Sequence, residues 1–105
     1  RYVADKRETA ACYAEFFKGK EDITFFTEPA DCKSNYWLNA VVLKDKAAQL
    51  DFLEYTNDHG VMTRPVWELM NRLPMFEHCE TDGLENTEWL ADRVVNIPSS
   101  VRLDK

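Results

Sequence analysis

Glycine, proline and cysteine are scarce in this chain of 105 residues, which contains 3 glycines, 4 prolines and 3 cysteines. So few glycines and prolines exclude collagen-like and low-complexity classes. The cysteines are odd in number and lack a Cys-x-x-Cys spacing, so they predict neither a disulfide framework nor a zinc site. We interpret Cys12, Cys32 and Cys79 as reduced thiols, which indicates a cytoplasmic protein.

Long apolar runs and an excess of positive charge are also lacking. No apolar run approaches the ~18 residues that a membrane span requires, so no membrane association is predicted. The formal net charge is -6, from 19 acidic and 13 basic side chains. Because binding to a phosphate backbone usually requires a basic face, nucleic acid is a poor candidate partner.

Apolar residues make up 45% of the chain, which is enough to close one hydrophobic core. The length fits a single domain over residues 1–105. Apolar residues at helical spacing up to Phe17 predict a first helix that is ended by Gly19, with Asp5 and Lys6 on its exposed side. The chain starts inside this helical pattern without an N-cap, so we expect it to be part of a longer protein.

The strongest strand signal lies at residues 36–43, where the apolar character is nearly continuous. Such a strand is expected to be central in its sheet or covered on both faces. A second helix is expected from the N-cap Asp45 to Gly60. Its expected buried side consists of Ala48, Leu50, Phe52, Leu53 and Tyr55. The other expected elements are strands at 23–27 and 61–64, a helical turn at 68–72 and a final helix at 86–94, followed by a turn at 96–100. This order predicts an α+β fold, a small antiparallel sheet packed with helices.

Catalytic motifs are missing from the sequence, which has no GxGxxG, P-loop, GxSxG or HExxH pattern. We interpret His59 as a residue at a helix end and His78 as a loop residue. Carboxylates gather at residues 51–58 and 77–82, but neither group has an apolar pocket in its local sequence. They are therefore interpreted as solvated surface rather than acid–base pairs. No catalytic or metal-binding residue is predicted.

Arg64 and Trp67, which flank Pro65 and Val66, form the most suggestive binding segment. A guanidinium can hold phosphate or carboxylate through two hydrogen bonds. An indole offers a flat face to a sugar or base ring. The alternative is structural, with an ion-paired arginine at a strand end above a tryptophan in the core.

Five segments occur along the chain in an order that is more specific than any of them alone. They are SNYWLN, NDHGV, RPVW, LPMF and EWLADRVVNIPSSV, at residues 34–39, 57–61, 64–67, 73–76 and 88–101. In this order they resemble the C-terminal domain of the DegT/DnrJ/StrS-type sugar-nucleotide aminotransferases. The resemblance covers nearly the whole chain and is greatest to the branch acting in bacterial nonulosonic-acid and related surface-glycan pathways.

The resemblance implies a fold and an activity. The fold would be that of the C-terminal small domain of fold-type-I aminotransferases. Enzymes of this family are homodimers that use pyridoxal 5′-phosphate (PLP) to move an amino group, usually from glutamate, onto a nucleotide-linked keto-sugar. Their cofactor-binding lysine and the acidic partner of the pyridine nitrogen lie in a large N-terminal domain. No catalytic residue is therefore assigned here, and no cofactor is expected on this chain by itself.

The resemblance also implies that Arg64, Trp67, Asn35 and Trp37 bind substrate. Many relatives carry a Tyr-x-Pro-x-His-like segment after the second strand, and Trp67 stands at its histidine position. Stacking or shape contact is therefore expected from Trp67, whereas Arg64 would contact a carboxylate or phosphate. Asn35 and Trp37 would begin the central strand near the same face. The alternative for Trp37 is a purely structural place in the core.

Two other functions remain open. One is an independent, non-catalytic acidic α+β module that binds a sugar or protein partner, and the other is a stand-alone regulator or immunity-type partner. The first helix separates these alternatives from an enzyme domain. If Tyr2 and Val3 are exposed, a covering partner domain is implied, whereas a closed polar surface would favour the independent module.

Overall fold

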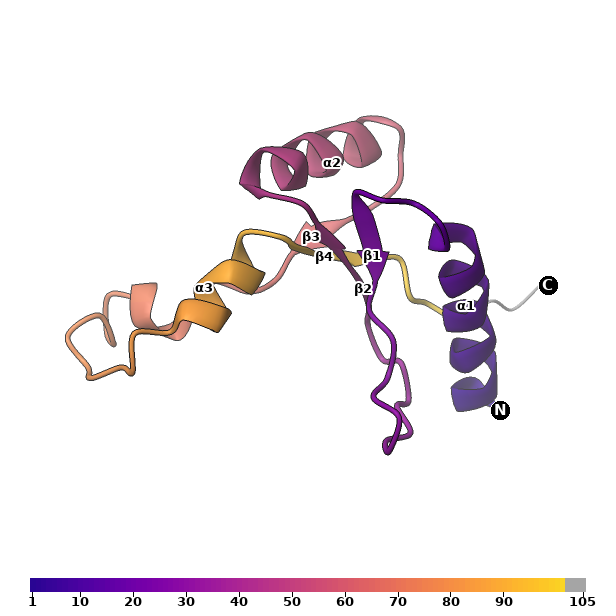
Figure 1. Cartoon of the computed structure of the whole chain (residues 1–105), viewed down its shortest axis with the longest axis horizontal. Coiled ribbons are helices and arrows are strands. Elements are labelled where there is room, and N and C mark those ends of the chain that lie inside the picture. The colour runs from indigo at the N-terminus through magenta and orange to yellow at the C-terminus, as the bar shows by residue number, and fades with distance from the viewer. Residues whose placement is uncertain (102–105) are drawn as a thin grey trace.

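The computed structural model, which describes residues 1–101, is an antiparallel sheet with helices packed on it (Figure 1). Its four strands are arranged in the order β1-β2-β4-β3. The elements along the chain are α1 (Tyr2–Phe17), β1 (Ile23–Phe25), β2 (Asn39–Leu43), α2 (Lys46–Asp58), β3 (Arg64–Pro65), the 3-10 helix η1 (Met70–Arg72), α3 (Glu85–Ala91) and β4 (Val94–Ile97). The expected α+β class and antiparallel sheet are confirmed.

Strand β4 corrects the expected end of the chain, where the sequence analysis placed a helix to residue 94 and then a turn. Helix α3 ends at Ala91, and β4 enters the sheet between β2 and β3. Val95 pairs with Val41 on one side and with Pro65 on the other. The β-branched residues of this segment favour an extended backbone, and pairing with two strands supplies hydrogen bonds that a terminal helix would lack.

Strands β2 and β3 also differ from their expected limits. β2 begins at Asn39 rather than at residue 36, because side chains form local turns just before it. Ser34 Oγ accepts from Tyr36 N at 2.9 Å, and Asn35 Oδ1 accepts from Trp37 N at 2.9 Å. β3 includes Pro65 instead of stopping before it. A proline is tolerated there because β3 is the edge strand, where its missing N–H breaks no ladder bond.

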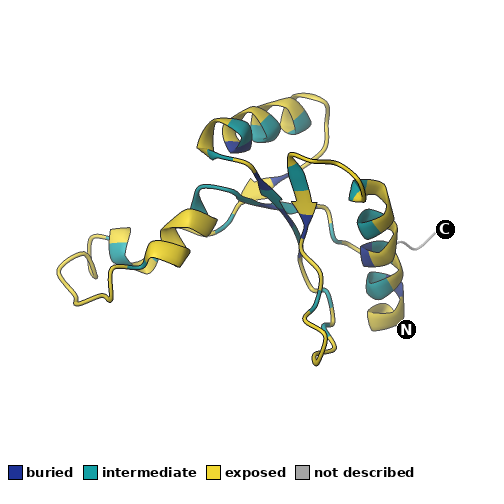
Figure 2. Cartoon of the chain, viewed as in Figure 1, coloured by how far each residue is buried: buried dark blue, intermediate teal, exposed yellow. Residues whose placement is uncertain are grey.

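One face of the sheet is covered. Successive side chains of a strand point to opposite faces, and burial alternates accordingly along β2 and β4. The covered face carries the buried Phe25, Val41, Leu43, Val95 and Ile97, which form the core with Ala10 of α1. Side chains of both α1 and α2 pack against this same cluster, so the domain has two layers (Figure 2).

The ends of α1 and α2 agree with the sequence, but their buried sides differ in part. Asp45 Oδ1 accepts from Ala48 N at 2.8 Å, which confirms the N-cap of α2. On α2, side chains that pack against the core as expected are those of Ala48, Phe52 and Leu53. Gln49 is also buried, however, whereas Leu50 and Tyr55 are exposed, contrary to expectation. On α1, Asp5 is buried rather than exposed. The direction of each helix against the sheet decides which stripe is buried, and this direction overrides the polarity of single residues.

Residues 66–91 leave the sheet after β3 and return to it at β4. We call this segment the arm. It contains η1 and α3 and extends away from the sheet at the left of Figure 1. Most of its residues are exposed in Figure 2. Across residues 1–101, no helix combines the length and apolar character needed to cross a membrane.

Candidate functional site

The four predicted binding residues come from three different places. Arg64 lies in the edge strand β3, Trp67 lies at the start of the arm, and Asn35 and Trp37 lie in the loop between β1 and β2. Through the register, Arg64 is level with Asn96 and Ala40. Strands β2 and β3 both run antiparallel to β4, and Trp37 precedes Ala40 whereas Trp67 follows Arg64. The two tryptophans therefore lie beyond opposite ends of the sheet. In Figure 1 the arm and the β1–β2 loop accordingly extend in different directions. Asn35 and Trp37 are brought together, but Trp67 is not near them.

Arg64 presents its guanidinium at the edge of the sheet without a carboxylate partner among residues 1–101. Its Nη1 donates to Thr63 O at 2.8 Å and to Asn57 Oδ1 at 3.3 Å. These neutral partners leave the positive charge of the side chain uncompensated. The alternative of a structural arginine held in an ion pair is therefore wrong. The guanidinium of Arg64 is available to bind an anion.

The position of Arg64 is set by the C-terminal end of α2. Thr63 is buried, and its Oγ1 lies 2.6 Å from Thr56 Oγ1. Asn57 Nδ2 donates to Thr63 O at 3.2 Å, while its Oδ1 holds Arg64. Three polar residues thus join the helix to the edge strand, which restricts where the guanidinium points.

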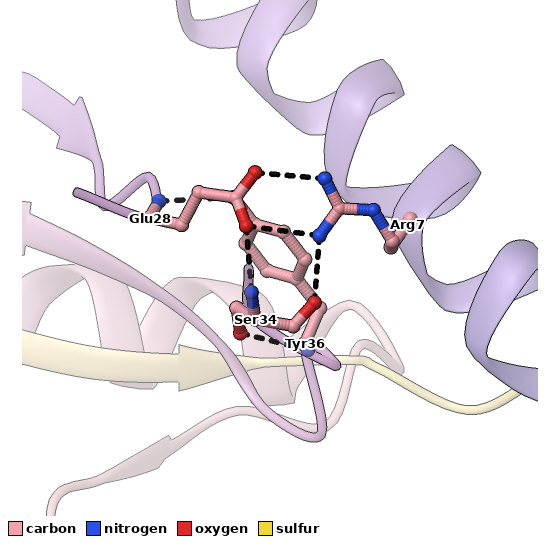
Figure 3. A network of polar contacts seen from close by, with 4 residues as sticks. All are labelled: Arg7, Glu28, Ser34 and Tyr36. Atoms are coloured by element: carbon pink, nitrogen blue, oxygen red, sulfur yellow. Dashed lines mark hydrogen bonds and ion pairs between the residues drawn. The ribbon is translucent and has the colours of Figure 1, made fainter. Parts of the chain in front are cut away.

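A polar network fastens the β1–β2 loop to α1 (Figure 3). Arg7 donates to Glu28 Oε1 at 2.9 Å and Oε2 at 2.8 Å, and also to Ser34 O at 2.7 Å. Glu28 Oε1 accepts from Ser34 N at 2.6 Å. The hydroxyl of Tyr36 accepts from Glu28 N at 3.0 Å, and the Arg7 guanidinium lies 5.6 Å from the centre of the Tyr36 ring.

The network changes the acidity of its two charged members. The hydrogen bond from Arg7, followed by that from the Ser34 backbone, lowers the pKa of Glu28 to about 2. The same hydrogen bond with Glu28 raises the pKa of Arg7. Both groups are therefore charged over the whole physiological pH range. Sequence reasoning missed this network, because Arg7 is at least 21 residues away along the chain from Glu28 and Ser34. No local motif marks these residues as partners.

Trp37 is displayed by this fastened loop. It is 63% exposed, so the alternative that it belongs to the core is wrong. Tyr36 just before it adopts a left-handed backbone with φ +49, which turns the chain sharply. Lys6 Nζ donates to Trp37 O at 3.3 Å and to Ser99 O at 2.8 Å. An exposed indole on a restrained backbone can stack on a ring at a low cost in conformational entropy.

Trp67 lies in a different environment, at one wall of an apolar cleft of about 580 Å³ within the arm. It is 76% exposed, so the interpretation as a core tryptophan beneath Arg64 is wrong. Met70, Phe76 and Leu84 also line this cleft. Residues 66–91 contain six acidic side chains and one arginine, a balance that disfavours a phosphate group there. The cleft suits an apolar or sugar-like group better.

The described residues do not form a PLP site by themselves. A cofactor lysine is normally withdrawn from water so that it can lose its proton. Five of the six lysines among residues 1–101 are exposed, and the sixth, Lys6, donates to two backbone carbonyls. This part of the chain also holds no group of three His, Cys, Asp or Glu side chains able to bind a metal. His59 lies at the end of α2 and His78 lies in a loop, as expected, and both are exposed.

Comparisons with known proteins give a consistent result. A model described as the DegT/DnrJ/EryC1/StrS aminotransferase family matches residues 1–105. The chain is similar to sugar aminotransferase CalS13 from Micromonospora echinospora, with 24% identity and a TM-score of 0.79 over 98% of this chain and 27% of that chain. Helicobacter pylori PseC, an aminotransferase involved in the biosynthesis of pseudoaminic acid, has 17% identity and a TM-score of 0.80 over 91% and 27%.

A third similar structure is E coli GDP-4-keto-6-deoxy-D-mannose-3-dehydratase with bound hydrated PLP. It has 16% identity and a TM-score of 0.72 over 93% of this chain and 26% of that chain. The comparison with curated proteins found no match. The chain spans about a quarter of the length of these three solved structures.

Proposed function

Because this chain belongs to the DegT/DnrJ/EryC1/StrS aminotransferase family, we propose that it is the C-terminal domain of a longer enzyme that makes amino-sugars. The full enzyme would move an amino group from glutamate to a nucleotide-linked keto-sugar, leaving 2-oxoglutarate. The observation that carries the proposal is the family match over residues 1–105. One similar structure is a sugar aminotransferase and another is an aminotransferase involved in the biosynthesis of pseudoaminic acid, which supports a sugar substrate.

PLP would be the cofactor, and it would be held by the part of the protein outside these residues. When bound, it supplies the electron sink that amino transfer requires. The E coli structure contains hydrated PLP, which supports this choice. The present chain would contribute substrate contacts and would close over the cofactor, and the fragment alone would be inactive. We further propose a cytoplasmic homodimer that supplies bacterial surface-glycan biosynthesis.

The substrate contacts would be divided between separate positions. Arg64 would hold a carboxylate or phosphate, because its charge is uncompensated and its position is preset by α2. Asn35 and Trp37 would contact a sugar or base ring from the fastened loop. Trp67 would make a shape contact through the apolar cleft of the arm. Since the two tryptophans extend from opposite ends of the sheet, they would contact different groups.

The exposed end of α1 favours an enzyme domain over an independent binding module. Tyr2 and Val3 are both exposed in this fold. Large apolar side chains left open in this way support the proposal, because another domain would cover them. An independent acidic module, or a stand-alone regulator, would be expected to close this surface with polar side chains.

The proposal is tested with the full-length protein purified from its source cells. We expect a chain much longer than 12.3 kDa with a yellow chromophore that borohydride bleaches by attaching it to one lysine. Incubation with glutamate and a nucleotide-linked keto-sugar should release 2-oxoglutarate and place the glutamate nitrogen on the sugar, detected with ¹⁵N-glutamate by mass spectrometry.

Two other outcomes would change the assignment. A colourless chain of the present length would overturn the enzyme proposal and leave a binding module. A coloured enzyme that removes a hydroxyl group from the sugar and incorporates no nitrogen would instead assign the dehydratase reaction named for the E coli structure.

A further inference from the structure

The sheet has a second face that no helix of the described chain covers. It is made by the strand residues that alternate with the core residues. Phe26, just after β1, and Leu38, just before β2, continue the same alternation. We call it the open face, and its residues are Thr24, Phe26, Leu38, Ala40, Val42, Arg64, Val94 and Asn96. Each of them is half-buried or exposed, whereas five residues of the opposite face are buried in the core with α1 and α2 packed against them.

The centre of the open face is apolar. Its two central strands contribute Ala40 and Val42 from β2 and Val94 from β4. A sheet face that stays in water normally alternates to polar side chains at such positions. The polar residues of this face lie around these three. Asn96 on β4 is paired with Arg64 on one edge strand, and Thr24 lies on the other edge strand. An apolar centre with a polar rim is the pattern of a protein interface.

The open face also contains a hollow of about 180 Å³ where the β1–β2 loop meets β2. Phe26, Leu38 and Ala40 of the open face line it, together with Tyr36 and Glu28 of the polar network. Phe26 remains 60% exposed although it borders this hollow. The fastened loop therefore holds open a site that fits one apolar side chain of a covering surface.

We propose that the open face docks against the part of the full-length protein that lies outside these 105 residues. This inference rests on the proposed function, which supplies the occupant. The chain corresponds to about a quarter of the length of its solved relatives, so the remaining part is large enough to cover the face. A covalently joined domain has an effective concentration on the order of millimolar, which favours it over a second copy of the chain.

Docking on this face would place Arg64 at the edge of the interface between the two domains of the complete enzyme. Arg64 lies at the rim of the open face rather than in its apolar centre. Ligand sites form preferentially where two domains meet. The guanidinium would therefore stand at the mouth of the cleft between the domains, where an anionic substrate group enters.

Thiol labelling of the full-length protein tests the docking. In a background where the native cysteines are replaced by serine, Phe26→Cys reports the open face and Leu50→Cys on the outer side of α2 is the matched control. The two positions are 60% and 53% exposed in the present fold, so without docking their thiols should react at similar rates. We expect the Phe26→Cys thiol to react at least about tenfold more slowly, since labelling must await opening of the interface.

Equal labelling rates in folded protein would overturn the inference. Protection that is lost on dilution, in step with dissociation of a dimer, would also overturn it, because a second copy would then be the cover. Hydroxyl-radical oxidation of the unmodified full-length protein repeats the comparison without substitutions, using Phe26 against the exposed Tyr55. Amino transfer is measured separately, so an inactive protein with a protected Phe26 would contradict the proposed function alone.

Discussion

At the scale of single residues, Glu28 and Arg64 represent two kinds of charged group. Glu28 is satisfied by Arg7 and by the Ser34 backbone, so its charge maintains structure. Arg64 has only neutral partners, so its charge remains available to a ligand. Sequence reasoning singled out Arg64 as a candidate binding residue from its neighbours in the chain. It could not find Glu28, because the fold brings the partners of Glu28 to it.

The stabilising effect of Glu28 should depend on pH. Its folded-state pKa, about 2, lies below its ordinary value of 4.5. The carboxylate therefore stabilises the fold above pH 4.5, and this contribution is lost as the pH falls toward 2. We expect Glu28→Gln to lower the Tm at pH 7 and the difference from wild type to shrink below pH 4.5. Thermal melts between pH 7 and 3 measure this effect.

Glu54→Gln on the exposed surface of α2 is the matched control for that series, and it should leave the Tm nearly unchanged at every pH. A Tm difference for Glu28→Gln that stays constant from pH 7 to 3 would contradict the role assigned to its charge.

Replacement of Arg64 should weaken substrate binding rather than the fold. In the full-length enzyme, Arg64→Gln should raise the KM of the anionic substrate about 10- to 100-fold, the range expected for hydrogen bonds to a charged group. Arg64→Lys should recover only part of this loss, since an ammonium lacks the two-pronged geometry. Steady-state kinetics measure both variants. Arg72→Gln, which removes only an exposed ion pair with Glu68, is the control and should change KM little.

At the scale of elements, the buried Gln49 joins helix α2 to the return of the arm. Its Nε2 donates to Ala91 O at 2.9 Å and to Val94 O at 3.0 Å, at the end of α3 and the start of β4. The sequence analysis considered only apolar residues as the buried side of α2, so it overlooked this amide. The burial of Gln49 could not be recognised from its neighbours in the sequence, because the two carbonyls that it contacts lie 42 and 45 residues away.

Removal of the Gln49 amide should destabilise the junction between α2 and β4. Gln49→Leu has a similar volume but leaves two carbonyls without a donor, and we expect a loss of about 2–4 kcal/mol in the free energy of unfolding. Urea denaturation measures it. Leu50→Ala, at the exposed neighbouring position, should cost less than about 0.5 kcal/mol. Equal effects of the two substitutions would show that the amide has no special part in the junction.

At the scale of the whole molecule, the sheet keeps the two exposed tryptophans apart. Trp37 lies just before β2 at one end of the sheet, whereas Trp67 lies just after β3 at the other end. The family resemblance grouped both as substrate contacts, but it contained no information on their separation. Residues with no shared partner act independently in binding, so their effects should add.

This separation predicts additive losses of affinity. In the full-length enzyme, Trp37→Ala and Trp67→Ala should each weaken nucleotide-sugar binding, and the double variant should match their summed free energies within about 0.5 kcal/mol. Isothermal titration calorimetry provides the four affinities. A coupling well above that value would mean that both indoles contact one ligand group, contrary to the arrangement described here.

The sequence by itself determined what depends on neighbouring residues and on pattern. The N-cap Asp45, the positive φ of Gly19 and Gly60, the α+β class and the family all belong to this group. Caps and turns form within a few residues of the chain, so the residues that specify them are adjacent.

Only the tertiary structure decided which residues face inward and which surfaces remain open. The burial of Asp5 and Gln49, the entry of β4 into the middle of the sheet, the projection of the arm and the open face are set by contacts between distant segments. Such contacts depend on the order of the strands and on the rotation of each helix against the sheet. Local propensity encodes neither of these, because one sequence pattern is compatible with several packings until the segments meet.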